Sequence, residues 1–365
     1  MIKTTLKKIV DRNKFKQVSA SILEQMNKGE GNVKLLPSSK NYDWWTTEKE
    51  AKDNLCLGKV ITMGRARYSN TKYHDGLFVS SNNHVINSKD EKVLNPRYLY
   101  HLILENEKKF YVDTSTYPKF DSNIFDNLSI NLPPIDIQNE IVEVLDKFTE
   151  LEAELEAELE ARTKQYEYYK NKLLINDKFR KIKLSDIGPV KMCRRIFKNQ
   201  TTDKGDIPFY KIGTFGVEAD AYISRELFLE YKDKYPFPNK SDVLLSASGT
   251  IGRRVIYEGE DAYFQDSNIV WIDNDETIVL NKYLYYLYGI IDWKVSSGGT
   301  ISRLYNKIIL NTEVLVPPFN EQKRIVSILD KFSSLVNDIK EGLPAEIELR
   351  RKQYEYYRNK LLTFE

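Results

Sequence analysis

The sequence predicts an α+β protein with an internal pseudo-twofold repeat. Two domains of curled antiparallel β structure with short helices are expected, joined by two long antiparallel coiled-coil helices. The first observation is a phrase at 165–174 (QYEYYKNKLL) that returns almost unchanged at 353–362 (QYEYYRNKLL). The second is that a Pro-Pro pair followed by a helical pattern also occurs twice, at Pro133-Pro134 and Pro317-Pro318. A repeat this long is outside the roughly 20–50 residues of a solenoid unit, so it indicates a duplicated module.

The first domain is expected within residues 1–131. The runs 60–65 and 78–86 contain β-branched and aromatic residues bounded by Gly and Asn, which favours short strands. Residues 94–100 predict a short helix. The same order recurs weakly in the second half, because 60–65 resembles 251–253, 78–86 resembles 264–272, and 94–100 resembles 280–285. The two domains are therefore expected to share a scaffold and to differ in their surface side chains.

Residues 132–178 are expected to form the central helical spacer. From Ile141 to Leu173 apolar residues recur at steps of three, four and seven, which is the pattern of an amphipathic helix with a coiled-coil seam. Asp136 follows the first Pro-Pro pair and is the expected N-cap, because a carboxylate can accept the free N–H groups of the first turn.

The tetrad Glu-Leu-Glu-Ala occurs three times in succession at 150–161. Its glutamates repel one another at four-residue spacing along the helix surface, so Leu151, Leu155 and Leu159 are expected to bury against a partner helix. The repetition is interpreted as a spacer whose length matters. The alternative is a merely solvated helix surface.

Residues 179–315 are expected to form the second domain. Apolar runs at 243–246, 255–257, 262–264 and 269–272 are separated by Gly, Asp and Asn, as a curled antiparallel sheet requires. The segment 249–254 (GTIGRR) is interpreted as a turn that exposes Arg253 and Arg254. A phosphate-binding loop is the alternative, but neither GxxxxGK[ST] nor GxGxxG is present.

Residues 316–365 are expected to form the C-terminal helical spacer and to supply the partner of the central helix. Asn320 is the candidate N-cap. The segment 342–344 (GLP) lies inside the helical pattern, and proline removes a backbone hydrogen bond there. A break is therefore predicted, with a new helix from Pro344.

The composition is that of a globular chain of 365 residues with a formal net charge of +2. Residues 1–131 contain 21 Lys and Arg against 15 Asp and Glu, which allows an anionic partner without proving one. Cys56 and Cys193 stand apart without a CxxC pair, which favours a reducing compartment. The N-terminus lacks the apolar stretch of a signal peptide, and no apolar run approaches the roughly 20 residues of a membrane span. A soluble, cytoplasmic protein is expected.

Catalytic motifs are missing where they would be expected. Adenine-N6 methyltransferases use Asn/Asp-Pro-Pro-Tyr/Phe, but Val316 and Leu132 occupy the polar position here, and no Gly-rich turn for S-adenosylmethionine precedes either pair. The histidines, His74, His84 and His101, lack metal-ligand spacing. No cofactor and no metal are expected, and the chain is expected not to be an enzyme.

The two variable segments, each followed by a Pro-Pro-led helix that ends in QYEYYxNKLL, resemble the specificity subunits of type I restriction–modification systems. The resemblance covers essentially the whole chain and is most specific at 317–322 and at both QYEYY phrases. One departure is Ile137, where the second copy has Glu321.

The resemblance implies that each variable segment is a target-recognition domain that reads one half of a bipartite double-stranded DNA target. It implies that the helices set the half-site spacing and dock two methyltransferase subunits, with motor-nuclease restriction subunits joining through the complex. The alternatives are a coiled-coil protein–protein adaptor that binds no DNA, and a diverged methyltransferase. Salt-sensitive binding to a split sequence would distinguish DNA recognition from the adaptor alternative. Binding of S-adenosylmethionine by the isolated chain would support the methyltransferase alternative.

Polar and basic residues in the predicted loops are the candidates for DNA contact, because Lys and Arg bind phosphates while Arg, Asn, Ser and Thr read base edges. In the first domain these are Arg65, Arg67, Lys72, His74, Asn82 and Asn83. In the second domain they are Lys211, Thr214, Ser248, Thr250, Arg253, Arg254, Ser267 and Arg303. The repeated tyrosines are candidates for packing on the partner helix or on another subunit, with base stacking as the alternative: Tyr166, Tyr169, Tyr354 and Tyr357.

Overall fold

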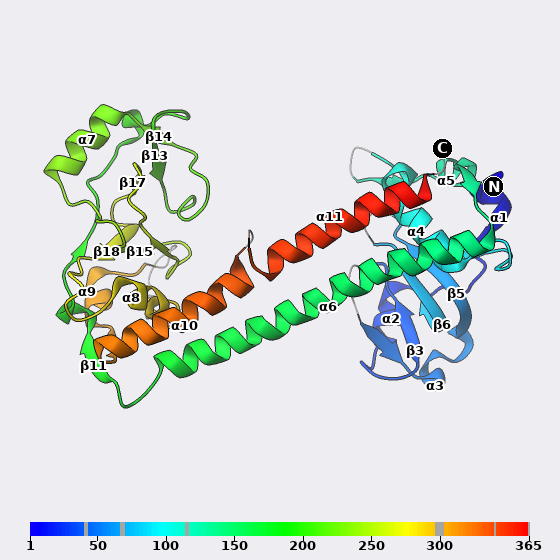
Figure 1. The fold of residues 1–365 in the computed structure, drawn as a ribbon, viewed down its shortest axis with the longest axis horizontal. Coiled ribbons are helices and arrows are strands. Elements are labelled where there is room, and N and C mark those ends of the chain that lie inside the picture. Colours follow the sequence, from blue (N-terminus) through cyan, green and yellow to red (C-terminus); the bar gives the residue numbers. More distant parts are fainter. Residues whose placement is uncertain (40–42, 66–69, 114–116, 296–302, 339–340, 364–365) are drawn as a thin grey trace. The chain divides into compact units, whose positions relative to one another are not determined.

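The computed structural model describes residues 1–39, 43–65, 70–113, 117–295, 303–338 and 341–363 (Figure 1). The chain divides into two compact units. Unit 1 consists of Met1–Ala157 and Glu346–Glu365, and unit 2 consists of Glu158–Ala345. Each unit therefore combines one β-containing domain with helical segments from both halves of the sequence. The predicted division at 131, 178 and 315 stays a prediction.

The first domain contains ten strands and five α-helices among its described residues. In chain order its elements are β1 (Ile2–Thr5), α1 (Leu6–Ile9), β2 (Val10–Arg12), α2 (Ala20–Met26), β3 (Val33–Leu36), β4 (Trp44–Thr46), α3 (Glu48–Ala51), η1 (Lys52–Asn54), β5 (Cys56–Met63), β6 (Lys72–Ser80), β7 (His84–Ser88), α4 (Pro96–Asn106), η2 (Glu107–Phe110), β8 (Tyr111–Val112), β9 (Lys119–Phe120), α5 (Ser122–Asn127) and β10 (Ser129–Leu132).

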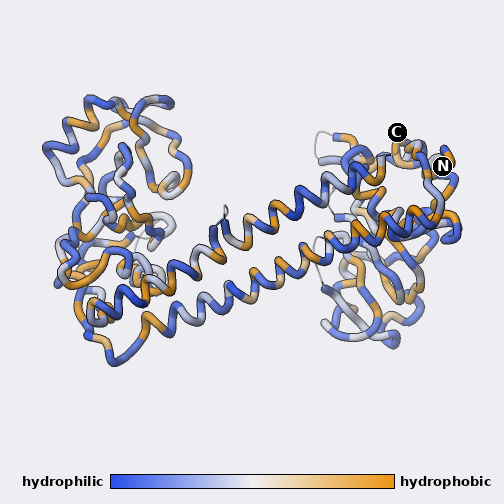
Figure 2. Tube along the Cα trace, viewed as in Figure 1, coloured by the Kyte–Doolittle hydropathy of each residue, from blue (hydrophilic) through white to orange (hydrophobic). Residues whose placement is uncertain are grey.

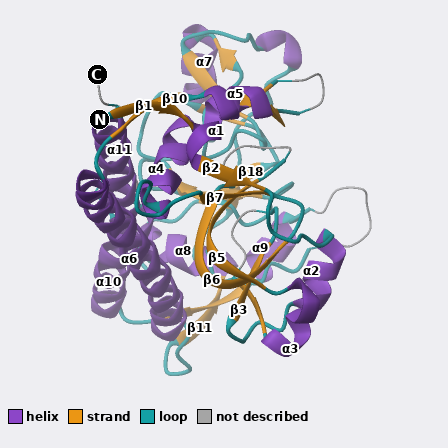
Figure 3. Cartoon of the chain, turned by 90° about the vertical axis from the view of Figure 1, so that its right-hand side faces the viewer, coloured by secondary structure: helices purple, strands orange, loops and turns teal. Residues whose placement is uncertain are grey.

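A mixed six-stranded sheet organises this domain, in the order β2-β7-β5-β6-β3-β4. Figure 3 shows β5, β6 and β7 side by side, with the helix pair α2 and α3 near β3. All neighbours are antiparallel except β3 and β6, which pair in parallel with Lys34 opposite Phe78. The predicted antiparallel sheet is confirmed except for this one parallel pair. β3 and β6 can run in the same direction because β4, α3 and β5 connect them.

The second domain follows the same path with shorter strands. Its elements are β11 (Arg180–Lys183), η3 (Leu184–Asp186), β12 (Val190–Lys191), η4 (Lys198–Gln200), β13 (Ile207–Tyr210), β14 (Tyr222–Ile223), α7 (Arg225–Lys234), β15 (Val243–Ser246), β16 (Arg254–Ile256), β17 (Tyr263–Phe264), β18 (Ile269–Ile272), α8 (Asn281–Tyr288), α9 (Asn306–Asn311) and β19 (Glu313–Val316).

Strand pairing shows that the two domains share one topology. The order β12-β18-β15-β16 repeats β2-β7-β5-β6, and β13 pairs in parallel with β17 as β3 pairs with β6. The long strand β6 corresponds to β16 and β17 together, which are separated by 257–262. The predicted duplication is confirmed. The predicted likeness of 60–65 to 251–253 is wrong in detail, because β5 corresponds to β15 and 251–253 lies in the turn that follows β15.

A two-stranded ribbon closes each domain immediately before the Pro-Pro pair. β1 pairs with β10 and places Ile2 opposite Leu132, while β11 pairs with β19 and places Arg180 opposite Val316. Strand pairing thus fixes the chain up to the residue that precedes the prolines. The prolines then continue directly into the helices.

The helical spacers are α6 (Ile135–Leu174), α10 (Phe319–Asn337) and α11 (Leu343–Leu362). The predicted long helix is confirmed, as is the break near Pro344, although the new helix begins one residue earlier. Both predicted N-caps are wrong, because Asp136 and Asn320 lie inside the first turn. The carbonyls of Pro134 and Pro318 instead accept the first helical N–H groups, from Gln138 and Gln322.

Within unit 1, α6 and α11 pack antiparallel. Phe148 meets Tyr357, and further along α6 Glu152 and Glu156 bind Arg351. Residue numbers in these contacts rise along α6 while they fall along α11, which shows that the two helices run in opposite directions. Of the leucines that were expected to bury, Leu151 is 45% exposed, whereas Leu155 and Leu159 are half-buried. The expectation is therefore wrong for Leu151.

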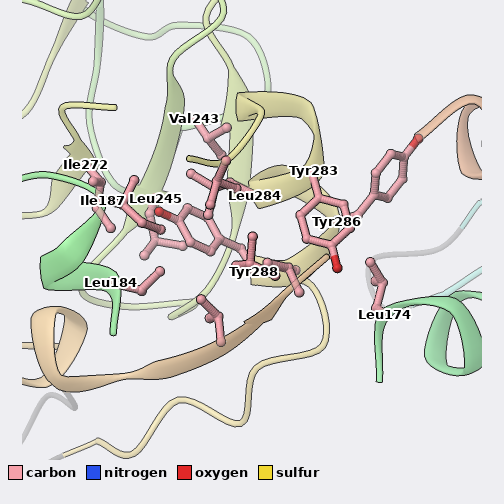
Figure 4. Packing of buried hydrophobic residues seen from close by; sticks show 14 of the residues in the cluster. Leu174, Leu184, Ile187, Val243, Leu245, Ile272, Tyr283, Leu284, Tyr286 and Tyr288 are labelled. Atoms are coloured by element: carbon pink, nitrogen blue, oxygen red, sulfur yellow. The ribbon is translucent and has the colours of Figure 1, made fainter. Parts of the chain in front are cut away.

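Aromatic residues of the short helices fill the cores. In unit 2, Tyr283, Leu284 and Tyr286 of α8 lie among apolar strand residues such as Val243 and Leu245 (Figure 4). In unit 1 the equivalent helix α4 packs in a cluster that also contains Tyr354 and Leu362 of α11. Figure 2 shows hydrophobic residues recurring along α6 between hydrophilic ones. Among the described residues, no helix combines the length and apolar character that crossing a bilayer requires.

Candidate nucleic-acid interface

Polar segments next to strands of two sheets meet in the second domain. The segment after β13 contacts the β15–β16 turn through Arg253, whose guanidinium donates to the Phe215 carbonyl at 2.8 Å. The same segment contacts the loop after β17, because the Ile212 N–H donates to the Gln265 side chain at 2.9 Å. Arg303 joins this loop by donating to the Ser267 hydroxyl at 2.9 Å. The strands thus carry separate polar loops to one place.

Seven of the eight residues predicted for this domain lie on these loops. The hydroxyl of Ser248 is bonded to Asn268 at 2.8 Å, and its backbone forms a bridge with Arg303. Lys211 pairs with Asp220 at 2.8 Å, and the Thr214 hydroxyl accepts from the Lys211 N–H at 3.1 Å. Thr250 is exposed at the tip of the β15–β16 turn. The loops therefore present a hydroxyl, amide and guanidinium surface of the kind that can bind phosphates and base edges.

Arg253 and Arg254 point to different surroundings, although they are adjacent in the sequence. Arg253 lies on the loop side against Phe215. Arg254 begins β16 and stacks on Tyr285 of α8, with the guanidinium carbon 4.7 Å from the ring centre. A Cβ added at Gly289 would lie 2.4 Å from the same guanidinium. The turn is confirmed, but the expectation that it exposes both arginines is wrong, because both are half-buried and contact other segments: Arg253 the Phe215 carbonyl and Arg254 the Tyr285 ring.

In the first domain a glutamine connects two of the predicted residues. The Gln17 side chain accepts from the exposed Arg65 guanidinium at 3.3 Å and donates to the Asn83 carbonyl at 2.9 Å. Asn83 itself is 2% exposed, and its amide donates to the Leu36 carbonyl at 2.9 Å and to Ser80 at 3.2 Å. Asn83 therefore shapes the loop from inside, while the adjacent Asn82 is exposed.

Lys72 and His74 both lie on β6. The Lys72 ammonium donates to the carbonyls of Pro37 and Ser39 at 2.7 and 2.6 Å, and burial together with Lys34 lowers its pKa to about 8. The His74 Nε2 atom is 3.0 Å from the Leu77 carbonyl, and burial lowers the pKa of His74. Both side chains are half-buried. Arg67 lies outside the described residues, and all the predicted DNA contacts stay predictions.

The repeated tyrosines have two kinds of environment. Tyr166 and Tyr354 are each 7% exposed, and the Tyr354 hydroxyl is 3.0 Å from Nδ1 of His101. Tyr169 and Tyr357 are 38% and 41% exposed and pack beside Phe332 and Phe148. The expectation of packing on the partner helix is met within the chain for Tyr166, Tyr169 and Tyr357, whereas Tyr354 contacts His101 of α4. Contact with another subunit stays a prediction.

Gln17, Gln265 and the pair Arg195–Asp266, whose Nε–Oδ2 distance is 2.9 Å, also make contacts at these loops and were not among the predicted residues. Gln265 could have been found from its position, because it follows the strand pattern directly and begins a polar loop. Gln17 and Arg195 precede their partners by many residues, and no local pattern indicates these contacts. Among the described residues, no group of three or more His, Cys, Asp or Glu side chains is placed to hold a metal ion.

The geometry is that of two copies of one domain with different polar loops, and the comparisons with known proteins define its class. The family model for the type I restriction modification DNA specificity domain matches residues 5–161 and 176–349. The chain therefore belongs to the type I restriction–modification DNA specificity family, whose members provide sequence-specific DNA recognition. None of the relatives supports the adaptor alternative.

Two curated relatives illustrate the similarity. The putative type I restriction enzyme specificity subunit S.HindORF215P of Haemophilus influenzae is 54% identical over 299 residues, which cover 79% of this chain and 77% of the relative. The type I restriction enzyme EcoR124I/EcoR124II specificity subunit of Escherichia coli is 34% identical over 248 residues, which cover 62% of this chain and 59% of that protein. Both are named as specificity components.

Solved structures confirm the fold. The S subunit of a type I restriction–modification system from M. genitalium has a TM-score of 0.63 at 16% identity and covers 100% of this chain and 96% of its own. A chain from a structure describing complex assembly and conformational transition of the type I R-M system has a TM-score of 0.61 at 14% identity, covering 99% and 97%. At these identities the likeness shows the fold alone.

Proposed function

We propose that this chain is the DNA-specificity subunit of a type I restriction–modification complex, and that each domain reads one half of a bipartite double-stranded target. The observation that carries the proposal is the duplication of one topology with different loop chemistry. The first domain offers Arg65 beside Gln17, whereas the second offers Arg253, Thr250 and Arg303 on converging loops. Two similar scaffolds with different reading surfaces suit a target with two unlike halves.

The central and C-terminal helices fit the role of spacers between the half-sites. The helix α6 runs without interruption from Ile135 to Leu174, about 60 Å at 1.5 Å per residue. Its first part belongs to unit 1 and its last part to unit 2. A continuous helix suits the role of a spacer, because an unstructured linker would allow a wide range of distances.

An exposed apolar stripe on these helices supports the docking of two methyltransferase subunits. On α6 the stripe consists of Ile137, Val144 and Leu151, which are 39%, 43% and 45% exposed and seven residues apart. At the corresponding places on α10 the second repeat has Glu321, the half-buried Ile328 and the 39% exposed Leu335, so its stripe is one residue shorter. Residues seven apart lie on one face of a coiled-coil helix, so each repeat offers a seam to a partner helix. The restriction subunits would join through the assembled complex.

Under this proposal the chain supplies recognition, and the partner subunits supply methyl transfer and cleavage. The test is to express the chain with the methyltransferase subunit of its own system and to map the methylated bases in host DNA. One split target with two defined halves and a fixed spacer is expected. A continuous target, or methylation by the purified chain with S-adenosylmethionine alone, would overturn the proposal.

The docking seam has its own test. Leu151→Glu and Leu335→Glu place a charge on each exposed seam, so both variants are expected to fold and to lose the methyltransferase subunit in a co-purification experiment. Glu150→Gln serves as a control because it changes an exposed residue of the same helix without touching the stripe. Full retention of the partner by both glutamate variants would place the docking surface elsewhere.

A further inference from the structure

One buried glutamine ties each domain to the start of its helix. In the first copy, Gln138 is fully buried in the first turns of α6. Its amide donates to the carbonyls of Val93 and Pro133 at 2.9 and 2.8 Å, and its side-chain oxygen accepts from the Asn95 N–H at 2.9 Å. Three segments are thereby joined: the loop before α4, the Pro-Pro entry and the helix.

The second copy repeats this arrangement atom for atom. Gln322 is 1% exposed, and its amide donates to the carbonyls of Ile278 and Pro317, each at 3.0 Å. Its side-chain oxygen accepts from the Leu280 N–H at 2.8 Å. Every hydrogen-bonding atom of both glutamine amides faces a backbone group from the domain or from the helix entry.

A second pair of equivalent contacts lies two turns further along each helix. Asp146 of α6 is 2.8 Å from both His101 and Arg97 of α4. Asp330 of α10 accepts from the Tyr286 hydroxyl at 2.5 Å and pairs with Lys282 at 3.4 Å, both from α8. The partners of the two aspartates differ chemically, whereas the glutamine partners are backbone groups in both copies. The glutamine contact therefore does not depend on which side chains the domain carries.

We propose that Gln138 and Gln322 are positioning residues that fix the angle between each recognition domain and its spacer helix, and thereby restrict the spacer lengths that the assembled complex accepts. The inference rests on the proposed function, because it assumes two domains reading one split target. The glutamine and aspartate contacts attach each domain to its helix at two points, and two points on a rigid helix define the angle between domain and helix. The glutamine contact lies where the chain passes from the domain into the helix. Neither glutamine lies on the reading loops, so the bases read should not depend on them.

Glutamine suits this place for a chemical reason. Its amide supplies two donors and an acceptor at the end of a flexible stem, and here both donors meet carbonyls of different segments. Methionine has a similar length but can satisfy none of these groups, which leaves buried backbone polar atoms without partners. Glutamate keeps the acceptor for the Asn95 or Leu280 N–H, but it loses the donors and places a carboxylate against two carbonyl oxygens, so it is the more severe of the two substitutions.

The experiment compares the wild-type complex with Gln138→Met, Gln138→Glu, Gln322→Met and Gln322→Glu. Each chain is co-expressed with the methyltransferase subunit and challenged with targets that keep both half-sites and vary the spacer by one base pair at a time. Gln25→Met, an exposed glutamine on α2, is the matched control. Half-site preference is measured in parallel with single-base substitutions in each outer sequence, and folding is checked by urea denaturation.

The wild-type and control complexes are expected to favour one spacer length. The glutamine variants should lower the ratio of methylation on that spacer to methylation on its neighbours by about 10-fold, which corresponds to about 1.4 kcal/mol. The half-site preferences should not change. If a glutamate variant does not fold, the methionine variant at the same position provides the comparison.

A loss of methylation that is uniform over all spacers, in a folded variant, would mean that the glutamines serve stability alone and would overturn the inference. An unchanged spacer profile would overturn it as well. A wild-type complex that shows no split target at all would instead refute the proposed function, so the two failures are distinguishable.

Discussion

Tyr357 of the second repeat stacks on Phe148 of the first, with ring centres 5.4 Å apart and ring planes 22° from parallel. The reciprocal contact is made in unit 2, where Tyr169 of the first repeat lies beside Phe332 of the second at 5.9 Å. Each compact unit therefore takes its phenylalanine from one sequence repeat and its tyrosines from the other. The tyrosine of each repeated phrase thus packs on the phenylalanine of the other repeat, and the same helix–helix contact occurs once in each unit.

The Tyr354–His101 contact is expected to contribute to stability. Burial lowers the pKa of His101, so the ring is neutral, and with Nε2–H directed at Asp146 its Nδ1 accepts from the Tyr354 hydroxyl. Tyr354→Phe leaves that nitrogen buried without a donor, which should cost about 1–3 kcal/mol in urea denaturation. Tyr356→Phe, at a position 60% exposed, is the control and should change little. Equal effects of the two substitutions would show that the buried hydrogen bond contributes nothing.

Substitutions of Arg253 and Arg254 are expected to have different effects, the first on DNA recognition and the second on stability. Arg253→Ala should weaken the preference at one half-site by about 1–3 kcal/mol, as the loss of a bidentate base contact does, and leave the other half-site intact. Binding of the assembled complex to targets with single-base substitutions provides the measurement. If both half-sites relax equally, or neither does, Arg253 does not read bases directly.

Arg254→Ala should act differently, because this guanidinium lies on the Tyr285 ring inside the second domain. The loss of the cation–π contact should lower the free energy of unfolding by about 0.5–2 kcal/mol, and the relative base preference at both half-sites should not change. Denaturation of the purified chain and the same substitution series measure the two quantities. A selective change in base preference, with stability retained, would contradict this assignment.

Deletion of residues 154–157 is expected to shorten the preferred spacer. One Glu-Leu-Glu-Ala unit corresponds to roughly 6 Å of helix and a turn of about 400°, so the downstream face returns within about 40° of its original direction. Glu160 then follows Glu152 by four positions, as Glu156 does now, and the carboxylates that bind Arg351 are retained. At about 3.4 Å per base pair, the optimum should move by one or two base pairs with unchanged outer sequences.

The spacer series described above measures this shift. Insertion of a fourth tetrad is the matched variant and should move the optimum in the opposite direction. An unchanged optimum in a folded, active deletion variant would mean that α6 does not set the distance.

Lys72 is expected to make the stability of the chain depend on pH in the alkaline range. Its pKa falls from 10.5 to about 8 because of burial and the nearby Lys34. The unfolded chain therefore binds more protons than the folded chain between these values, and the contribution of this group to stability rises as pH increases from about 8 to about 10.5. Lys72→Met should flatten the pH profile of urea denaturation in that window, whereas Lys119→Met, at an exposed position, should not. A profile that keeps its slope in Lys72→Met would contradict the expectation.

Local sequence patterns determined the long helices and several of the strands. The runs at 243–246 and 269–272 became β15 and β18 with the predicted bounds, because apolar strands between turn residues have few other ways to be buried. The second spacer is interrupted near Pro344 as predicted, with α10 ending at Asn337 and α11 beginning at Leu343, and Pro344 lies in the first turn of α11, where a missing N–H is tolerated. The repeated phrases established the duplication and, through the resemblance they carry, the family.

Tertiary structure alone decided how these parts are combined. Arg253 and Arg254 are neighbours with the same chemistry, and only tertiary contacts place one against the Phe215 carbonyl and the other on the Tyr285 ring. The burial of Gln138 and Gln322 depends on backbone atoms that lie more than forty positions away in the chain. The exchange that brings Tyr357 to Phe148 likewise joins residues from opposite halves of the sequence. Contacts between distant segments leave no local periodicity, because they are selected by packing of the whole unit rather than by the preferences of neighbouring residues.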